Sequence, residues 1–91
     1  MNATIEHQPG QDRFETGVGD LRAWIEYRLQ PGVMTITHTE VPAALEGQGI
    51  AGQLVEAALD HARSQGLKVN PSCSFARAYM QRHPETMAVH V

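Results

Sequence analysis

A glycine-rich stretch in the middle of the chain constrains the fold more than any other feature. Leu45-Glu46-Gly47-Gln48-Gly49-Ile50-Ala51-Gly52 follows a β-type segment and leads into a helical pattern. Glycine tolerates positive φ, so such a stretch lets a strand turn sharply into a helix. The first N–H groups of that helix have no partner inside it, and together with the helix dipole they favour a phosphate or pyrophosphate. We therefore expect the backbone N–H groups of residues 48–52 to form an anion site.

The spacing Gly47-x-Gly49-x-x-Gly52 also matches the dinucleotide fingerprint G-x-G-x-x-G. That fingerprint follows the first strand of a parallel sheet, whereas this stretch follows strands that read as antiparallel. A Walker loop is excluded, because no Gly-Lys-Ser/Thr follows. A tight β-to-α turn that holds no ligand is the remaining structural alternative.

The segment before the glycine stretch reads as an antiparallel meander of about four strands. Residues 23–29 alternate, with Ala23, Ile25, Tyr27 and Leu29 on one face and polar or mixed residues on the other. Turn residues separate the segments, and Pro42 ends the last strand because it has no N–H to donate. The expected strands are residues 3–7, 13–16, 23–29 and 33–41.

The segment after the glycine stretch reads as a β-α-β unit followed by a second helix. An apolar stripe predicts a helix from Ile50, which Gly66 is suited to end at the C′ position. Residues 67–69 then form a strand, which must run parallel to the last strand of the meander. A second helix spans residues 73–82 with Ser72 or Ser74 as N-cap, and the last seven residues close the sheet or fray. The fold class is therefore mixed α/β, as one domain over residues 1–91.

Composition narrows the classes of function. Seven Lys and Arg against ten Asp and Glu give a net charge of −3, with the cations scattered, so no nucleic-acid partner is expected. One cysteine excludes a disulfide framework, and no pair among the five histidines has the spacing of a helical metal site, so no metal is expected. There is no apolar run long enough to cross a membrane and no signal-peptide pattern, which predicts a cytoplasmic protein. Open sheet edges predict a monomer or a weak homodimer.

These patterns together resemble the acetyl-CoA-binding core of the GCN5-related N-acetyltransferases. Their signature is Arg/Gln-x-x-Gly-x-Gly/Ala, which the chain fits at Gly49 and Ala51 but not at Glu46. Over about residues 12–85, the chain is also similar to the small YjdJ-type subgroup of that superfamily in several separate sequence blocks. The blocks are His38-Thr39-x-Val41-Pro42, Gly47-Gln48-Gly49-Ile50-Ala51, Gly66-Leu67-Lys68-Val69, Pro71-x-Cys73-Ser74-Phe75-Ala76, Tyr79 and His83-Pro84.

The resemblance implies acetyl-CoA or CoA as the ligand. The loop N–H groups would hold the pyrophosphate, and the pantetheine arm would pair with the backbone of residues 39–41, with an N–H near Val41 as oxyanion donor. The implied cofactor-binding residues are Thr39, Val41, Gly47, Gln48, Gly49, Ile50, Ala51 and Gly52. Glu46 fits badly, because a carboxylate beside a pyrophosphate must turn away or weaken binding.

Transfer to an amine needs a base, an oxyanion donor and an acid for the departing thiolate. Tyr79 matches the superfamily position near the leaving sulfur, or is a core aromatic residue. Cys73, at the start of a helix, is a nucleophile, a general acid or a small buried hydrophobic residue. His38, placed on the face of Met34 and Ile36, and Glu40 are candidate bases, with a satisfied, partly buried histidine as the alternative.

Three hypotheses of function follow. The first is an N-acetyltransferase whose acceptor is an unidentified small-molecule or protein amine. The second is a non-catalytic module that binds CoA or acyl-CoA. The third is a structural or interaction domain without a ligand. Binding of CoA separates the third from the others, and release of free thiol separates the first from the second.

Overall fold

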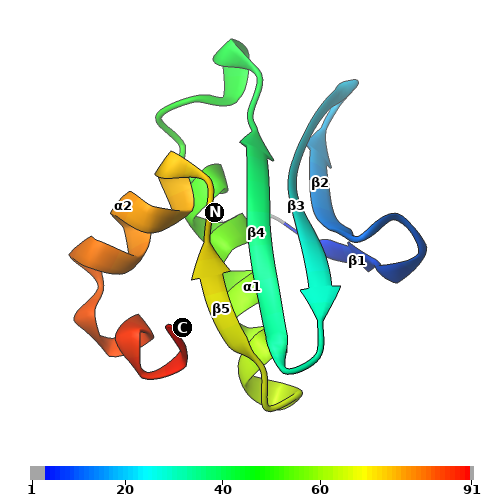
Figure 1. The fold of residues 1–91 in the computed structure, drawn as a ribbon. Helices are drawn as coiled ribbons and strands as arrows, with labels where there is room; N and C mark the ends of the chain where they lie inside the picture. Colours follow the sequence, from blue (N-terminus) through cyan, green and yellow to red (C-terminus); the bar gives the residue numbers. More distant parts are fainter. Residues whose placement is uncertain (1–3, 91) are drawn as a thin grey trace.

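The computed structural model describes residues 4–90, except the side chains of residues 87 and 88. Along the chain, a meander of strands is followed by a helix, one more strand and a second helix (Figure 1). The strands are β1 (Glu6–Gln8), β2 (Arg13–Val18), β3 (Leu21–Gln30), β4 (Val33–Glu40) and β5 (Lys68–Pro71). The α-helices are α1 (Ile50–Ser64) and α2 (Ser74–Arg82), and the 3-10 helices are η1 (Pro9–Gln11), η2 (Ala43–Leu45) and η3 (Pro84–Val89).

The strands form one five-stranded sheet in the order β1-β2-β3-β4-β5. The first three pairings are antiparallel, and β4 and β5 pair in parallel through the α1 crossover. This confirms the expected mixed α/β fold with its meander and β-α-β unit. The first strand occupies Glu6–Gln8 rather than residues 3–7, of which residue 3 lies outside the described residues.

The parallel pairing of β4 and β5 stops partway along β4. It runs from Val33 opposite Lys68 to Ile36 opposite Pro71. There the carbonyl of Ile36 accepts hydrogen bonds from the N–H groups of both Ser72 and Cys73, at 3.0 Å each. Residues 37–40 of β4 continue past this point with no paired residue on β5, so the two strands separate where α2 begins.

A β-bulge in β4 decides which side chains face the helices. Glu26 pairs with His38, but the next residue of β3, Tyr27, pairs with Ile36, which leaves Thr37 as the extra residue. An extra residue shifts the alternation of faces, so beyond it Thr39 lies on the face of buried Ile25. The prediction that His38 shares the face of Met34 and Ile36 is therefore wrong.

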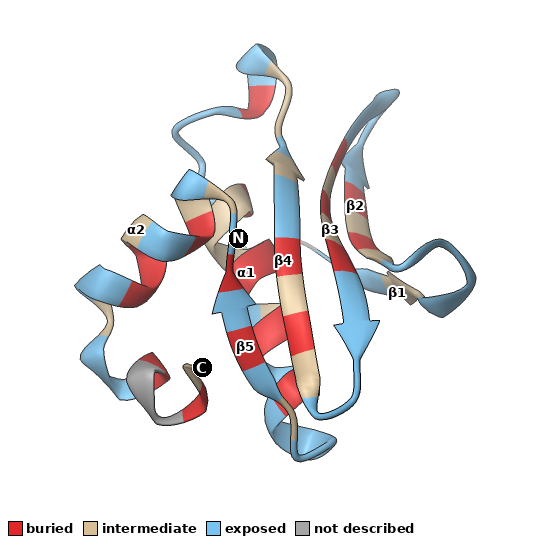
Figure 2. Ribbon diagram, in the orientation of Figure 1, coloured by how far each residue is buried: buried red, intermediate tan, exposed pale blue. Residues whose placement is uncertain are grey.

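The core lies between the sheet and α1. Buried positions alternate along β2, β3 and β4 and recur along one stripe of α1 (Figure 2). Ile25, Met34, Ile36, Leu54 and Val55 are fully buried, as the period-two and helical patterns predict. Leu29 departs from its pattern: it is 52% exposed, because it lies near the end of β3.

The end of α1 and the start of α2 are each capped by a specific residue. Gly66 has φ +69° and follows the last turn of α1, where the Leu67 N–H donates to the Ala62 carbonyl at 2.8 Å. This confirms the expected glycine stop. The N-cap of α2 is Cys73, whose Sγ accepts the Ala76 N–H at 3.3 Å, so the prediction of a serine N-cap is wrong.

Two further features complete the fold. Of the two alternatives for the last seven residues, the closing strand is not formed within the described residues, because residues 84–89 are a 3-10 helix and His90 makes an isolated bridge to Val69. Residue 91 lies outside the described residues. Among the helices of residues 4–90, none is long and apolar enough to cross a membrane.

A cluster of rings attaches β1 to the end of α1. The His7 ring stacks on Phe14 with centroids 4.2 Å apart, and the His61 ring from α1 lies edge-on to it at 4.4 Å. His7 Nε2 and the Tyr27 hydroxyl are 2.5 Å apart. Burial, and then the neighbouring His61, lower the pKa of His7 from its ordinary value of 6.5. Burial and Asp12 raise the pKa of Tyr27 above 10.0.

Candidate functional site

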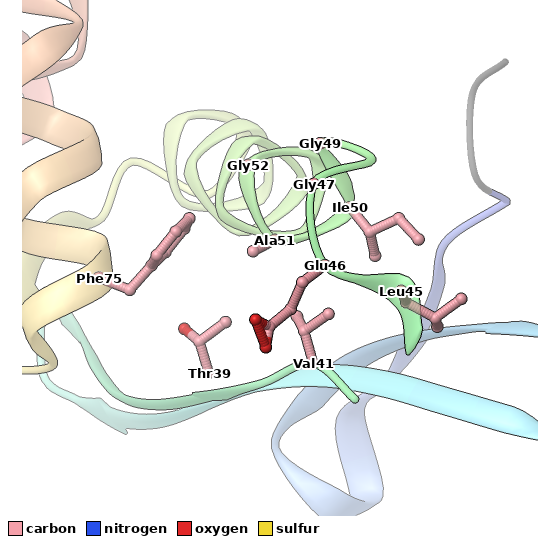
Figure 3. Close-up of a pocket in the computed structure, with 10 residues that line it drawn as sticks. All are labelled: Thr39, Val41, Leu45, Glu46, Gly47, Gly49, Ile50, Ala51, Gly52 and Phe75. Carbon is pink, nitrogen blue, oxygen red and sulfur yellow. The ribbon is translucent and has the colours of Figure 1, made fainter. Parts of the chain in front are cut away.

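A pocket of about 410 Å³ opens between the glycine loop, the end of β4 and α2 (Figure 3). This volume is in the range of pockets that hold small molecules and cofactors. The lining is Thr39, Val41, Leu45, Glu46, Gly47, Gly49, Ile50, Ala51, Gly52 and Phe75. Most of the residues predicted for cofactor binding therefore surround one cavity, and Gln48 alone of that set is not part of its lining.

The glycine loop exposes the start of α1 to this pocket. Gly47 and Gly49 have φ values of +81° and +76°, and an added Cβ at either would meet no heavy atom within 4 Å. Gly49 is the N-cap of α1, and no side chain caps the helix. The first intrahelical bond runs from the Gln53 N–H to the Gly49 carbonyl, so the N–H groups of residues 50–52 precede the helical ladder. The loop therefore presents bare backbone donors at the positive end of a 15-residue helix.

The opposite wall of the pocket comes from the unpaired end of β4. Thr39 and Val41 line it, and both follow the bulge at Thr37. Because residues 37–40 have no partner strand on the β5 side, their backbone edge is open to a ligand that carries amide groups. The bulge thus places the predicted pantetheine-binding residues, Thr39 and Val41, on the face of the sheet where the pocket lies.

Cys73 lies beside this wall, although it is not part of the lining. Its Sγ is 3.4 Å from Thr39 Oγ1 and accepts the Ala76 N–H, and its side chain is half-buried. The contact joins residues 34 positions apart across the point where β4 and β5 separate. Cys73 is therefore within reach of the end of the pocket, where Thr39 and Phe75 lie.

Two hydrophobic lining residues, Leu45 and Phe75, were not among the predicted site residues. Phe75 extends from α2 toward the pocket (Figure 3), and Leu45 lies at its other end on η2. The signal for Phe75 was its place in the Pro71-x-Cys73-Ser74-Phe75 block, directly after the strand that separates from β4. Leu45 carried no functional signal, because one apolar residue before a glycine is common in any turn.

Glu46 brings a carboxylate into this site. It lines the pocket, and its side chain extends from the loop toward Thr39 and Val41 (Figure 3). Glu46 is exposed and precedes the two left-handed glycines. A negative charge therefore stands beside the start of α1, where it partly neutralises the positive end of the helix dipole.

Tyr79 is not part of the pocket lining and packs against α1 at Gly52 and Glu56. Its hydroxyl donates a short hydrogen bond to Glu56 Oε2, and an added Cβ on Gly52 would lie 3.3 Å from the tyrosine ring. The ring also stacks on His83, with centroids 4.1 Å apart. Burial, followed by the hydrogen bond and charge of Glu56, raises the pKa of Tyr79 to about 12. In this arrangement the hydroxyl is engaged with a carboxylate and does not line the pocket.

The Tyr79 ring lines a second cavity, an open groove of about 620 Å³ that adjoins the pocket. The two cavities share Gly49 and Gly52. The groove is lined by Ile5, Gly49, Gly52, Gln53, Glu56, Ala57, Asp60 and Tyr79. Neither Glu56 nor Asp60 was among the predicted site residues, since no motif marks them.

His38 and Glu40 form a pair on the other face of the sheet. His38 Nε2 is 3.0 Å from Glu40 Oε1, and both side chains are about half exposed. Trp24 and Glu26 are their cross-strand partners, and the indole Nε1 donates to Glu26 Oε2 at 2.7 Å. The bulge places this pair on the face of the sheet opposite the pocket. The sequence suggested that both side chains are candidate bases, but neither lines the pocket.

No group of three or more His, Cys, Asp or Glu side chains within the described residues is arranged to hold a metal ion. The pocket is built instead from backbone donors, hydrophobic side chains and a few polar groups. Such a site suits an elongated ligand with a phosphate group at the helix end and an amide-bearing arm along β4.

Comparison with known proteins agrees with this geometry. A family described as GCN5-related N-acetyl-transferase matches residues 13–89. Protein NATD1 of Mus musculus is 38% identical over 83 residues, which cover 88% of this chain and 76% of the mouse protein. Protein NATD1 of Danio rerio is 35% identical over 83 residues, with the same coverage of 88% and 76%.

A solved structure has the same fold. The NMR structure of a GCN5-like protein from Staphylococcus aureus superposes with a TM-score of 0.78 at 32% identity, covering 99% of this chain and 89% of that one. The match in sequence spans β2 to β5, the glycine loop and both α-helices. The chain belongs to the GCN5-related N-acetyltransferase family.

Proposed function

We propose that this chain binds acetyl-CoA and transfers its acetyl group to an amine. One observation carries the proposal: an uncapped helix N-terminus opens onto a hydrophobic pocket that continues along the unpaired end of β4 to Thr39, whose hydroxyl contacts Cys73. Family membership supports it, since the family is named for this reaction. The YjdJ-type assignment and the cytoplasmic location stay predictions.

Different parts of the site would bind the pyrophosphate and the pantetheine arm of CoA. The N–H groups at the start of α1 would hold the pyrophosphate, and Gly47 and Gly49 leave room for close approach because no Cβ stands in the way. The backbone of Thr39 and Val41 would pair with the amides of the pantetheine arm. Bound there, acetyl-CoA supplies a thioester, whose carbonyl carbon is the electrophile.

Acetyl transfer then forms a C–N bond and breaks the C–S bond. The amine loses a proton, and the departing thiolate takes one up. Cys73 has acid and nucleophile chemistry and contacts Thr39, which lines the end of the pocket. An attack by the Cys73 thiolate would give an acetyl-cysteine, which the amine would resolve in a second step.

The other candidate catalytic residues, Tyr79, His38 and Glu40, would each act only under a specific condition. Tyr79 would have to leave Glu56 to protonate the thiolate. His38 and Glu40 would serve as base only for an acceptor that arrives on their face of the sheet, opposite the pocket. The acceptor itself, small molecule or protein, stays unassigned.

Calorimetric titration with CoA tests the binding step. Gly49→Ala places a Cβ in the open space of the loop, and we expect it to weaken CoA binding by about tenfold or more. Gly32→Ala is the matched control, because Gly32 also has φ +76° with no heavy atom near an added Cβ, but lies in the β3–β4 turn. Equal affinity in both variants, or no binding by the wild type, would refute the proposal.

Release of free thiol from acetyl-CoA in the presence of an amine panel tests the transfer step. We expect at least one amine to accelerate release above hydrolysis. Cys73→Ser should lower that rate without a comparable change in CoA affinity, whereas Tyr79→Phe should lower it only if the hydroxyl leaves Glu56 during transfer. Tight CoA binding with no accelerated release would instead identify a non-catalytic binding module.

A further inference from the structure

We propose that the groove beside the glycine loop selects against the 3′-phosphate of CoA, and that Glu56 is the residue responsible. The chain would then accept dephospho-CoA at least as well as CoA. This inference rests on the proposed binding of CoA at the loop. It concerns only which form of the nucleotide end is preferred.

The pocket and the groove place the two ends of such a ligand. Both cavities include Gly49 and Gly52, so they meet at the start of α1, where the pyrophosphate would lie. The pocket leads from there between hydrophobic residues toward Phe75 and Cys73, which suits the acyl-pantetheine arm. The groove leads away from Gly52 along α1 and is open, with polar and apolar side chains in its lining, which suits a nucleoside.

The charges along the groove oppose a phosphate. Glu56 and Asp60 line it, and none of its described lining residues is a lysine or an arginine. A 3′-phosphate carries close to two negative charges at neutral pH. A protein that used this phosphate for affinity would place a cation here, whereas this groove places carboxylates.

Glu56 and Asp60 do not contribute equally. Asp60 Oδ1 accepts from Arg63 Nη1 at 2.6 Å, so a cation on the same helix offsets its charge. Glu56 accepts instead from the neutral hydroxyl of Tyr79, which leaves its charge in place. Repulsion of a phosphate in the groove therefore comes mainly from Glu56.

Packing also fixes the position of Glu56. Tyr79 is 8% exposed, lies against Gly52 and stacks on His83, so its hydroxyl is a fixed donor. Glu56 stands one helical turn after Gly52, directly along the groove from the loop. The carboxylate thus remains near the path of the nucleotide rather than turning into solvent.

Titration of the wild-type chain with CoA and with dephospho-CoA tests the inference, because the two ligands differ only in the 3′-phosphate. At low salt we expect the affinity for CoA to be equal to or lower than that for dephospho-CoA. Glu56→Gln keeps an acceptor for Tyr79 but removes the charge, and should raise the affinity for CoA about two- to fivefold relative to dephospho-CoA. Added salt should reduce that gain.

Asp12→Asn is the matched control. It also removes one negative charge, but Asp12 acts on His7, which contacts His61 in the last turn of α1, away from the loop. The relative affinity should not change in this variant. Tighter binding of CoA than of dephospho-CoA by the wild type, or equal gains in Glu56→Gln and Asp12→Asn, would overturn the inference while leaving the proposed function intact. Binding of neither ligand would instead refute the proposed function and this inference with it.

Discussion

The sulfur of Cys73 lies 3.4 Å from the hydroxyl oxygen of Thr39, across the point where β4 and β5 separate. The same sulfur caps α2 by accepting the Ala76 N–H. One side chain therefore joins the open end of β4 to the start of the helix that closes the pocket. A thiol with both contacts is held in one place, which a nucleophile or acid at the end of a pocket requires.

The capping role predicts the behaviour of two Cys73 variants. Cys73→Ala removes the acceptor for the Ala76 N–H and should lower the free energy of unfolding by about 1 kcal/mol. Cys73→Ser supplies a preferred N-cap oxygen and should unfold at a urea midpoint close to the wild type. Equal midpoints for the two variants would show that the cap contributes nothing.

Glu46 predicts a gain of affinity on removal of its charge. Its carboxylate lines the pocket beside the N–H groups that would hold a pyrophosphate. Glu46→Gln should therefore tighten CoA binding about two- to fivefold at low salt, and less at high salt. Calorimetric titration at two salt concentrations measures this, and weaker binding by the variant would contradict it.

His7 predicts a loss of stability in acid. Burial and His61 lower its pKa in the folded chain, so the unfolded chain binds the proton more readily. The contribution of His7 is fully present above its ordinary value of 6.5 and is lost as the pH falls through the lower folded value. Urea midpoints measured from neutral to mildly acid pH should decline less for His7→Gln than for the wild type. Identical declines would show that other groups cause the effect.

Tyr79 predicts a late step in the alkaline titration. Its folded pKa of about 12 lies above the ordinary 10.0, so its contribution to stability is present below pH 10.0 and is lost as the pH rises through about 12. Tyr79→Phe keeps the ring against Gly52 but removes the titrating hydroxyl. Ultraviolet absorbance should show that the tyrosinate step near pH 12 disappears in this variant and persists in Tyr27→Phe.

Local patterns in the sequence predicted much of the fold because they are set by neighbouring residues. The alternation in residues 23–29 and the stripe from Ile50 record which side of each element meets the core. The sequence also indicated the place of the candidate site, because the positive φ values of Gly47 and Gly49 depend on the residue type. The candidate catalytic residues were harder to predict, because their roles depend on which face or neighbour they meet.

His38 and Tyr79 show why. A period-two pattern assumes that no residue is inserted, and the bulge at Thr37 arises only from the pairing of β4 with β3. It places His38 opposite the pocket. Tyr79 has a suitable position in its helix, but its partner Glu56 comes from another helix, through a close approach at Gly52, where an added Cβ would lie 3.3 Å from the ring. Contacts between distant segments leave no local signal.

The sequence by itself therefore determined the meander, the glycine turn, the parallel crossover and the glycine-rich start of α1. Each of these follows from backbone preferences and the burial of hydrophobic residues over short stretches. Only the tertiary structure decided that β4 and β5 separate after Ile36, and that Thr39 and Cys73 meet there. It also decided that Glu56 stands beside the loop, because packing of α2 on α1 fixes the tyrosine that holds it.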